Sequence, residues 1–197
     1  MFDHIQPVKP DPILSLMTQY AQDNRTEKMD LGIGVYRNDA GETPIMQAIK
    51  QAHIQQAQEQ ETKGYLGLAG NLPFNQQMTD LVLGKALSET LGERVQTIQT
   101  PGASGALRLI ADLIKLQNPN ATVWISDPSY VNHRPIMEAA GLTVKTYPYF
   151  DGQTKQVKEA EMLDTISGLG TDDVVLLHGC CHNPTGANLN LTQWQQV

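Results

Sequence analysis

The chain has 197 residues, of which 40% are hydrophobic, and a formal net charge of −7 at pH 7. That length is enough to bury a core and lies near the upper end of what one domain holds. The acidic balance, without a cluster of lysine or arginine, argues against a nucleic-acid-binding protein. No apolar run approaches the ~20 residues that cross a bilayer. Because the first residues also lack the features of a signal peptide, we expect a cytoplasmic protein that contacts no membrane.

The first part of the chain is predicted to hold an arm, two helices and a short strand. Residues 1–10, with two prolines, are expected to form an extended arm. A helix is expected to follow Asp11, its N-cap, and to run through Leu14, Met17 and Tyr20. Residues 29–36 predict a strand whose glycines allow another group to approach the backbone. The apolar residues of 44–62 have helical period, and the later part of this segment is polar enough to be solvated.

The rest of the chain is predicted to alternate between strands and helices. A glycine-punctuated loop at residues 64–70 comes first. The predicted strands are 95–100, 122–126, 143–149 and 174–178, and the predicted helices are 73–91, 104–117, 132–140 and 158–167. Such a run of β-α units predicts the α/β class, with a mostly parallel sheet covered by helices. A last helix, with Thr192 as N-cap, has little more than a turn, so the chain is expected to be incomplete at its C-terminus.

The segment Thr100–Arg108, with the sequence TPGASGALR, lies between a predicted strand and a predicted helix. Small residues let the backbone wrap an anion, and the first amides of the helix point toward it. The hydroxyl of Ser104 adds a donor, which makes a phosphate site one interpretation. An ordinary tight turn with Ser104 as N-cap is the other, and the segment alone does not decide between them. It is neither a P-loop nor a full dinucleotide-binding fingerprint.

Polar side chains also follow two other predicted strands. Tyr130 and His133 come shortly after the strand at 122–126, and His178–Gly186 follows a buried apolar run. The second segment, HGCCHNPTG, breaks its strand and places Asn183 beside the opening. Because open α/β sheets bind ligands at the carboxyl ends of their strands, we expect these side chains to share one edge. A lone histidine at a helix start is more often structural, but this setting favours a functional role for His133.

The histidines and cysteines of His178–His182 also invite a metal-site interpretation. Zinc sites usually draw paired ligands from two separated segments, and this sequence has no second cluster. Buried structural thiols are therefore the favoured interpretation of Cys180 and Cys181. Adjacent cysteines rarely bridge each other, so no disulfide framework is expected, which fits a reducing compartment. Nothing in the sequence fixes a base beside either sulfur, which disfavours cysteine catalysis.

With these residues in place, HGCCHNPTG resembles the signature of the aspartate/aromatic amino acid aminotransferases, pyridoxal-phosphate (PLP) enzymes of class I and fold type I. The segments DPIL, LGIGVYR, YLGLAG, PGASGALR and SDPSYVNH follow the same family in order. The resemblance covers nearly the whole chain and corresponds to the N-terminal half of the family. It implies a PLP-dependent transferase-like fold with helices on both faces of the sheet. Residues 11–44 would then be the first part of a small domain, and residues 45–197 the first part of a large cofactor-binding domain.

The resemblance implies cofactor-binding roles for five residues of this large domain. Ala103 and Ser104 would lie in the turn that holds the PLP phosphate. Tyr130, at a position where the family commonly has tryptophan, would stack on the cofactor ring. His133 would support the carboxylate that pairs with the pyridine nitrogen, and Asn183 would bond the phenolic oxygen. Ala103 replaces a usual glycine, which matters only if that position needs a positive φ.

The resemblance also implies substrate contacts and a shared active site. Gly34, Tyr130 and Asn183 would bind the substrate, with Gly34 offering backbone contact to its carboxylate. Tyr65 would reach the cofactor phosphate of the neighbouring subunit, which implies an obligatory homodimer. The bonds before Pro128 and Pro184 match positions that are cis in the family, so both are predicted to be cis.

The implied chemistry is transamination between an aromatic or dicarboxylic L-amino acid and a 2-oxo acid such as 2-oxoglutarate or oxaloacetate. In the family, the Schiff-base lysine, the aspartate that pairs with the pyridine ring and the carboxylate-binding arginines all follow the Asn-Pro-Thr-Gly element. Few residues follow it here, so we expect this chain to be catalytically incomplete and inactive alone. No motif matching that of the catalytic lysine surrounds any of Lys50, Lys63, Lys85, Lys115, Lys145, Lys155 or Lys158.

Two alternatives remain open from the sequence. One is a different PLP enzyme of fold type I, such as a lyase that acts on amino acids, and analysis of the products would distinguish it. The other is a non-enzymatic fragment that binds a phosphorylated ligand or a partner subunit with its exposed half-sheet. The missing lysine keeps this second alternative open, although an open sheet edge tends to aggregate or to seek another strand.

Overall fold

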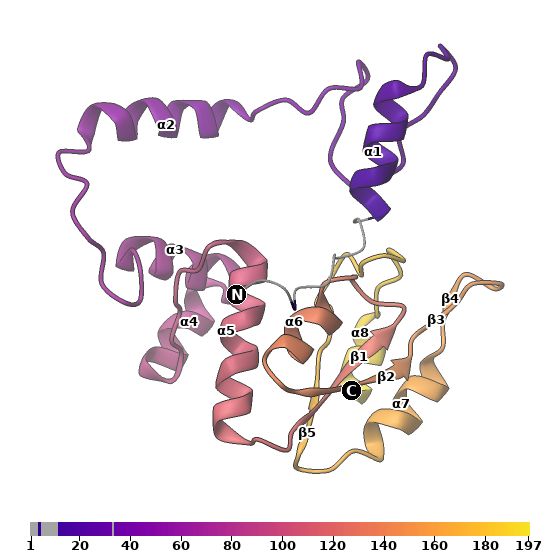
Figure 1. Ribbon diagram of the computed structural model, residues 1–197. Coiled ribbons are helices and arrows are strands. Elements are labelled where there is room, and N and C mark those ends of the chain that lie inside the picture. The colour runs from indigo at the N-terminus through magenta and orange to yellow at the C-terminus, as the bar shows by residue number, and fades with distance from the viewer. Residues whose placement is uncertain (1–3, 5–11, 33) are drawn as a thin grey trace. The chain divides into compact units, whose positions relative to one another are not determined.

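The computed structural model of the chain describes residue 4, residues 12–32 and residues 34–197. The chain divides into two compact units, residues 1–64 and residues 65–197. Figure 1 traces both units in colours that run from indigo at the N-terminus to yellow at the C-terminus. The parallel sheet belongs to the second unit.

The helices of the first unit are α1 (Pro12–Gln22) and α2 (Gln47–Glu59). The arm predicted at residues 1–10, except His4 in a turn, and the cap predicted at Asp11 lie outside the described residues. α2 is shorter than the helix predicted over residues 44–62. None of its residues is buried, so the solvated surface expected for the later part extends over the whole helix.

The strand predicted at residues 29–36 is wrong for the described residues 29–32 and 34–36, which have no strand. A strand needs a neighbour that pairs its backbone N–H and C=O groups, and the described part of the first unit contains none. Side chains organise this segment instead. The Arg37 guanidinium lies 2.6 Å from the Asp30 carboxylate, and Asn38 Oδ1 accepts the backbone N–H of Ala40 at 3.0 Å.

The second unit contains a three-stranded sheet in the order β2-β1-β5, and every pairing in it is parallel. β1 (Thr122–Asp127) is the central strand, β2 (Thr143–Pro148) lies on one side, and β5 (Asp173–Val175) lies on the other. The N–H of Leu176 donates to the Trp124 carbonyl at 2.8 Å, which continues the β5 pairing by one residue. The α/β class and the mostly parallel sheet predicted from the sequence are confirmed.

Helices cover both faces of this sheet, as predicted. The helices of the second unit are α3 (Leu72–Leu83), α4 (Lys85–Leu91), the 3-10 helix η1 (Gly92–Arg94), α5 (Gly102–Gln117), α6 (His133–Ala139), α7 (Glu159–Ser167) and α8 (Leu191–Gln196). In Figure 1, α5 and α6 lie on one side of the sheet and α7 lies on the other. No helix in the described part of the chain is long and apolar enough to pass through a membrane.

Alternation along β1 separates two hydrophobic cores. Side chains of successive strand residues point to opposite faces, so Val123 and Ile125 pack with Ala111 of α5 and Met137 of α6. Trp124 points the other way, into a second core that holds Met162 of α7 with Tyr147 and Tyr149. The two cores hold the helices against the sheet and thereby set where the strand ends lie.

The helix predicted over residues 73–91 is two helices, because Gly84 interrupts it. Gly84 has a φ of +78° and caps the end of α3 and the start of α4. Glycine reaches this backbone region without the strain that a side chain would cause. α3 begins one residue earlier than predicted because Asn71 caps it, and the Asn71 side chain accepts the N–H of Phe74 at 2.9 Å.

The strand predicted at residues 95–100 is wrong, since these residues have no strand partner among the described residues. Contacts to α3 and to the loop before it hold the segment instead. The Thr97 hydroxyl lies 2.6 Å from the Thr79 hydroxyl on α3, and the N–H of Gln99 donates to the Ala69 carbonyl at 3.0 Å. Val95 has the φ and ψ of a strand, so the local preference is present and only the neighbour is missing.

Two smaller elements also differ from the prediction. An antiparallel hairpin of β3 (Phe150–Asp151) and β4 (Gln156–Val157) was not predicted, although Asp-Gly at 151–152 is a turn signal. The cap of α8 is Asn190 rather than Thr192. Asn190 and Gln193 form a capping box, in which each side chain accepts the other residue's backbone N–H.

The packing of Met162 predicts a large loss of stability for Met162→Ala. The side chain is 0% exposed in the second core, and large-to-small changes in a core cost about 2–5 kcal/mol. The free energy of unfolding from urea titration should fall by that amount. Met46→Ala removes the same atoms at a position that is 71% exposed and should change it by less than about 0.5 kcal/mol. Equal losses for the two variants would contradict the assigned core.

Candidate active site

The start of α5 has no side-chain cap, and the amide of Gly102 donates to the Thr100 carbonyl at 2.8 Å. α5 begins at Gly102, and its N-cap residue, Pro101, makes no side-chain cap hydrogen bond. The first four N–H groups of an α-helix have no partner within the helix, and they form the positive end of its dipole. Ser104 is the third residue of the helix and is exposed, so the alternative prediction that it caps the helix is wrong. An anion such as phosphate suits this helix end.

Two glycines allow the backbone of this turn to pack closely against the start of α5. Gly102 has a φ of +72°, and a Cβ atom added to Gly105 would lie 2.9 Å from the ring of Pro101. Ala103 is not among the residues with positive φ. The alanine that replaces a usual glycine at this position therefore introduces no backbone strain.

The turn after β1 holds Tyr130 and His133 against each other. His133 is the first residue of α6 and is buried. Its Nδ1 lies 2.9 Å from the Ser129 hydroxyl, and its ring meets the Tyr130 ring edge-to-face with centroids 5.3 Å apart. Asn132 donates from Nδ2 to the Tyr130 hydroxyl at 2.9 Å. The bonds before Pro128 and Pro184 are both cis, as predicted.

His182 connects the turn after β5 to the end of β1. Its side chain is 2% exposed. Nε2 lies 2.9 Å from the Ser126 hydroxyl and Nδ1 lies 2.8 Å from the Thr185 hydroxyl. The ring stacks on Tyr149 with centroids 4.0 Å apart. Hydroxyl groups can donate or accept, so a neutral imidazole satisfies both bonds.

His178 lies between the other two histidine rings. Its centroid is 5.1 Å from that of His133 and 4.2 Å from that of His182. Nδ1 accepts the backbone N–H of Asn183 at 3.1 Å, which leaves the proton of the neutral ring on Nε2. That atom is buried and has no hydrogen-bond partner among the described residues. A buried donor without an acceptor costs about 1–3 kcal/mol of stability. This ring is therefore suited to donate a hydrogen bond to an acceptor that the described residues do not supply.

Burial keeps all three histidines neutral at pH 7. It lowers the pKa of His133, with a further lowering by His178, and it lowers the pKa of His178. The pKa of His182 falls furthest, to about 4, first through burial and then through the neighbouring histidines. Three rings this close would repel one another if they were charged, so the cluster is a set of neutral hydrogen-bonding groups.

Two adjacent cavities bring four of the predicted cofactor-binding residues together. A cavity of about 340 Å³ is lined by Tyr130, His133, Asn183 and His178, among others. A neighbouring, mostly apolar cavity of about 480 Å³ is lined by Ala103 and shares His133 with the first. Neither set of lining residues includes a lysine. Residues from α5, from the turn after β1 and from the turn after β5 thus converge at the carboxyl edge of the sheet, where open α/β sheets bind ligands.

Three other predicted site residues are not among the lining residues of these cavities. Ser104 is exposed one residue beyond Ala103 on α5. Tyr65 is fully exposed at the start of the second unit. Gly34 belongs to the first unit and has open space where a Cβ atom would be. Their roles stay predictions.

The cysteines differ from the prediction. Cys180 and Cys181 are free thiols, and both are exposed rather than buried. Cys181 has a φ of +49° in the turn that carries the chain from His178 to His182, and this turn carries the side chains out of the core. Among the described residues, no three histidine, cysteine or acidic side chains are arranged to hold a metal ion.

The roles of His178 and His182 as packed rings were not predicted, and neither were Ser126 and Thr185, the hydrogen-bond partners of His182. The sequence carries a partial signal, because both histidines flank the end of the same buried strand. What it lacks is the long-range pairing. Ser126 and His182 are 56 residues apart, and only the parallel pairing of β1 with β5 brings them together.

The low pKa of His182 predicts a loss of stability in acid. The unfolded chain takes up this proton near pH 6.5 and the folded chain only near pH 4, so the contribution is present above pH 6.5 and is lost as the pH falls toward 4. Urea unfolding between pH 7.5 and 4.5 should show this decline. His182→Gln should flatten it and lower stability at pH 7 by about 1–3 kcal/mol. His53→Gln, at an exposed histidine of α2, should leave stability at pH 7 unchanged, and an unaltered slope in His182→Gln would refute the assignment.

Comparison with known proteins gives one consistent family. The profile described as "Aminotransferase class I and II" matches residues 26–197. The chain is 43% identical over its full length to an aromatic-amino-acid aminotransferase of Paracoccus denitrificans and 41% identical to an aspartate aminotransferase of Haemophilus influenzae, and it covers 49% and 50% of those proteins. An aromatic-amino-acid aminotransferase of Burkholderia pseudomallei, solved covalently bound to pyridoxal phosphate, superposes with a TM-score of 0.95 at 38% identity, over all of this chain and 49% of that one. The chain spans about half the length of the curated relatives that it matches.

Proposed function

The chain belongs to the aminotransferase class I and II family, and from this we propose that it supplies the phosphate- and ring-binding part of a PLP-dependent transaminase. The observation that carries the proposal is that Ala103, at the start of α5, lines a cavity that shares His133 with the cavity lined by Tyr130 and Asn183. The reaction would move an amino group between an aromatic or dicarboxylic L-amino acid and a 2-oxo acid. Relatives named for aromatic and for aspartate substrates both support that substrate range.

The start of α5 fits the phosphate of PLP. No side chain caps its first amides, and Gly105 keeps the turn close to the helix. Ala103 and Ser104 would hold the phosphate, Ala103 with its backbone and Ser104 with an exposed hydroxyl as well. Backbone donors of this kind act locally, so they can attract a dianion although the chain as a whole is acidic.

The cavity beside α5 fits the ring. Bound PLP supplies an electron-withdrawing pyridine ring that stabilises negative charge on the substrate carbon. Tyr130 would pack on that ring and Asn183 would donate to its phenolic oxygen. His133 would position the group that pairs with the ring nitrogen. His178 fits the same site, since its buried Nε2–H has no acceptor within the described part of the chain.

The catalytic step needs a lysine that this chain is proposed to lack. No lysine is among the residues that line the two cavities, and the relatives are about twice as long. We therefore infer that the chain holds cofactor-binding groups without the group that moves the substrate proton, and that it is inactive alone.

The proposal includes a homodimer with a shared active site. Tyr65 would reach the cofactor phosphate of the neighbouring copy, and its complete exposure leaves it free to do so. Gly34, together with Tyr130 and Asn183, would contact the substrate. A cytoplasmic location fits this amino acid chemistry.

Binding of the phosphate is tested with pyridoxine 5′-phosphate, which has no aldehyde and so cannot form adventitious imines with surface lysines. Isothermal titration should show affinity at least about tenfold higher than for pyridoxine, because a dianion at a helix start gains charge-assisted hydrogen bonds. Gly105→Ala, which crowds Pro101, should abolish the difference, whereas Gly152→Ala, at a position with open space, should preserve it. Equal affinities for the two ligands in the unaltered chain would contradict the proposed site.

Catalytic incompleteness is tested by activity. The chain with PLP, 2-oxoglutarate and either L-tyrosine or L-aspartate should form no 2-oxo acid above a control without protein, because the proton-transferring lysine is missing. Borohydride reduction followed by peptide mapping should find no single preferred lysine. Turnover above the control, or one lysine reduced in stoichiometric yield, would show that the chain carries its own catalytic base.

A further inference from the structure

The loop Tyr65–Gly70 presents exposed side chains on a closed backbone. Tyr65 and Leu68 are fully exposed, and Leu66 is mostly exposed. The loop closes on itself through the Gly70 N–H, which donates to the Gly67 carbonyl at 2.9 Å. Side chains in such positions gain nothing from packing here, so the conformation of this loop depends on how its backbone is held.

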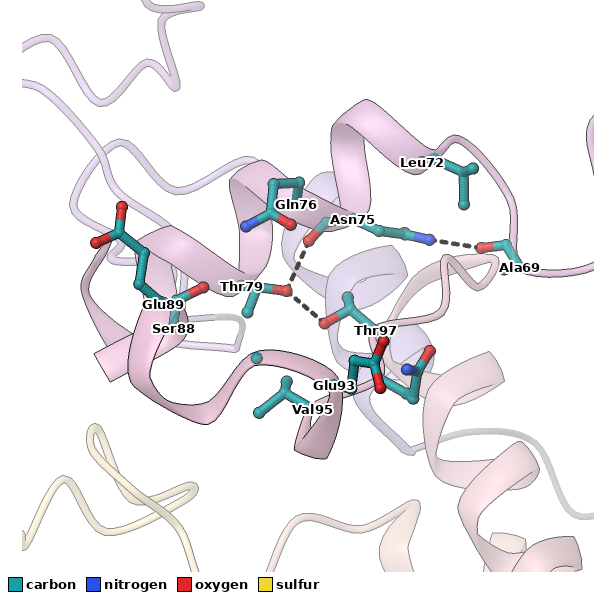
Figure 2. Close-up of a pocket in the computed structure, with 12 residues that line it drawn as sticks. Ala69, Leu72, Asn75, Gln76, Thr79, Ser88, Glu89, Glu93, Val95 and Thr97 are labelled. Carbon is teal, nitrogen blue, oxygen red and sulfur yellow. Dashed lines mark hydrogen bonds between the residues drawn. The ribbon is translucent and has the colours of Figure 1, made fainter. Parts of the chain in front are cut away.

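One carbonyl of the loop accepts two hydrogen bonds. Ala69 O accepts the N–H of Gln99 at 3.0 Å and the side-chain Nδ2–H of Asn75 at 2.8 Å. Figure 2 shows the Asn75 amide of α3 reaching the Ala69 carbonyl. The Gln99 side chain adds a third hydrogen bond next to the loop, because its Oε1 accepts the N–H of Asn71 at 2.8 Å.

The two residues that donate to the Ala69 carbonyl lie on segments that are hydrogen-bonded to each other. Asn75 is on α3, and Gln99 is in the segment that leads to α5. The Thr79 hydroxyl donates to the Asn75 carbonyl at 2.9 Å and lies 2.6 Å from the Thr97 hydroxyl, which joins α3 to that segment. Both interactions are drawn in Figure 2. The loop is therefore held from two sides by parts that are tied to each other.

Asn75 occupies its place at a cost to stability. Its side chain is 6% exposed, yet its Oδ1 is buried and has no hydrogen-bond partner among the described residues. An unsatisfied buried acceptor costs more than an ordinary neutral hydrogen bond returns, so an apolar residue would suit this position better for folding alone. An apolar residue cannot donate to Ala69.

We propose that Asn75 is a positioning residue that locks the loop Tyr65–Gly70 and so fixes where Tyr65 is presented to a second copy of the chain. The inference rests on the proposed function, which gives Tyr65 its role at the neighbouring copy's phosphate. Gln99 shares the task through Ala69 and Asn71, and Gly70 must stay a glycine because a Cβ atom there would lie 2.4 Å from the Gln99 Cβ.

The variant Asn75→Asp tests the lock, because it keeps the shape and exchanges the donor for an acceptor. At neutral pH the introduced carboxylate would face the Ala69 carbonyl and release the loop. At lower pH the protonated carboxyl would donate again. Burial raises the pKa of such a group, and so do the carboxylates of Glu89 and Glu93, which line the same cavity of about 520 Å³ as Asn75. Asp80 is the one other acidic residue of α3. The hydrogen bond to the Ala69 carbonyl should therefore re-form, and hold the loop again, as the pH falls from 7.5 to 5.

The measurement is amide hydrogen exchange by NMR, expressed as protection relative to the intrinsic rate at each pH. In Asn75→Asp, the amides of Gly70, Asn71 and Gln99 should lose about tenfold protection at pH 7.5 and regain most of it at pH 5, as expected when one buried hydrogen bond is broken and remade. Amides of β1 should not follow this pH course. Gln77→Glu adds the same charge at an exposed position of α3 and should leave the loop unchanged, and Gln99→Glu keeps the acceptor for Asn71 and should do the same.

Unchanged loop protection in Asn75→Asp, or a loss that pH does not reverse, would overturn the proposal. A loss spread equally over β1 would also overturn it, since Asn75 would then be a general structural residue. This readout contains no cofactor, so a failure of pyridoxine phosphate to bind would count against the proposed function alone. If the phosphate binds, Asn75→Asp and Tyr65→Phe should weaken it by the same factor and non-additively, because one residue acts through the other.

Discussion

The neutral imidazole of His182 is the contact on which the geometry of the site depends. It joins the end of β1, through Ser126, to the turn after β5, through Thr185, and it stacks on Tyr149 beyond β2. A protonated ring would have to donate at both nitrogens and would face two other histidines at close range. Burial excludes that form at neutral pH, so the three segments stay joined. His178 and Asn183 take their positions from this junction because they belong to the same short turn.

The sheet supplies the rest of the geometry. Since β1 and β5 are parallel neighbours, their carboxyl ends open at one edge, and the start of α5 meets the same edge through the core that α5 shares with Val123 and Ile125. The alternation of side chains along β1 separates this core from the one around Met162. The site is thus positioned by packing on both faces of a short sheet, whereas its polar atoms come from the turns.

Much of this arrangement was predictable from local pattern, and the exceptions share a physical cause. The strands predicted at residues 122–126 and 143–149, and the helices that follow them, are nearly as predicted. Their apolar residues recur with the period of the element that forms, and these residues are buried against elements that are close in sequence. The strand predicted at residues 95–100 has the right backbone preference at Val95 but no partner among the described residues. Gly84 divides a helix whose apolar pattern continues through it, because one backbone angle outweighs the pattern. In the site, motif positions identified Tyr130, His133 and Asn183 as neighbours. They did not predict that the cysteines are exposed or that the His178 ring stacks on His182, because both depend on long-range pairing that no local pattern encodes.

The parallel pairing of β1 with two strands has a consequence for the order in which the chain folds. Thr122 pairs with Thr143 on one side and with Asp173 on the other, so the second loop to be closed contains more than twice as many residues as the first. Closing a longer loop costs more chain entropy, and contacts distant in sequence form more slowly. The unit of β1, α6 and β2 should therefore be the early nucleus, and β5 should dock onto it afterwards. The histidine cluster, which exists only once β5 has docked, is then among the last parts of the sheet edge to form, and a chain trapped before that step would have native-like strands but no binding site.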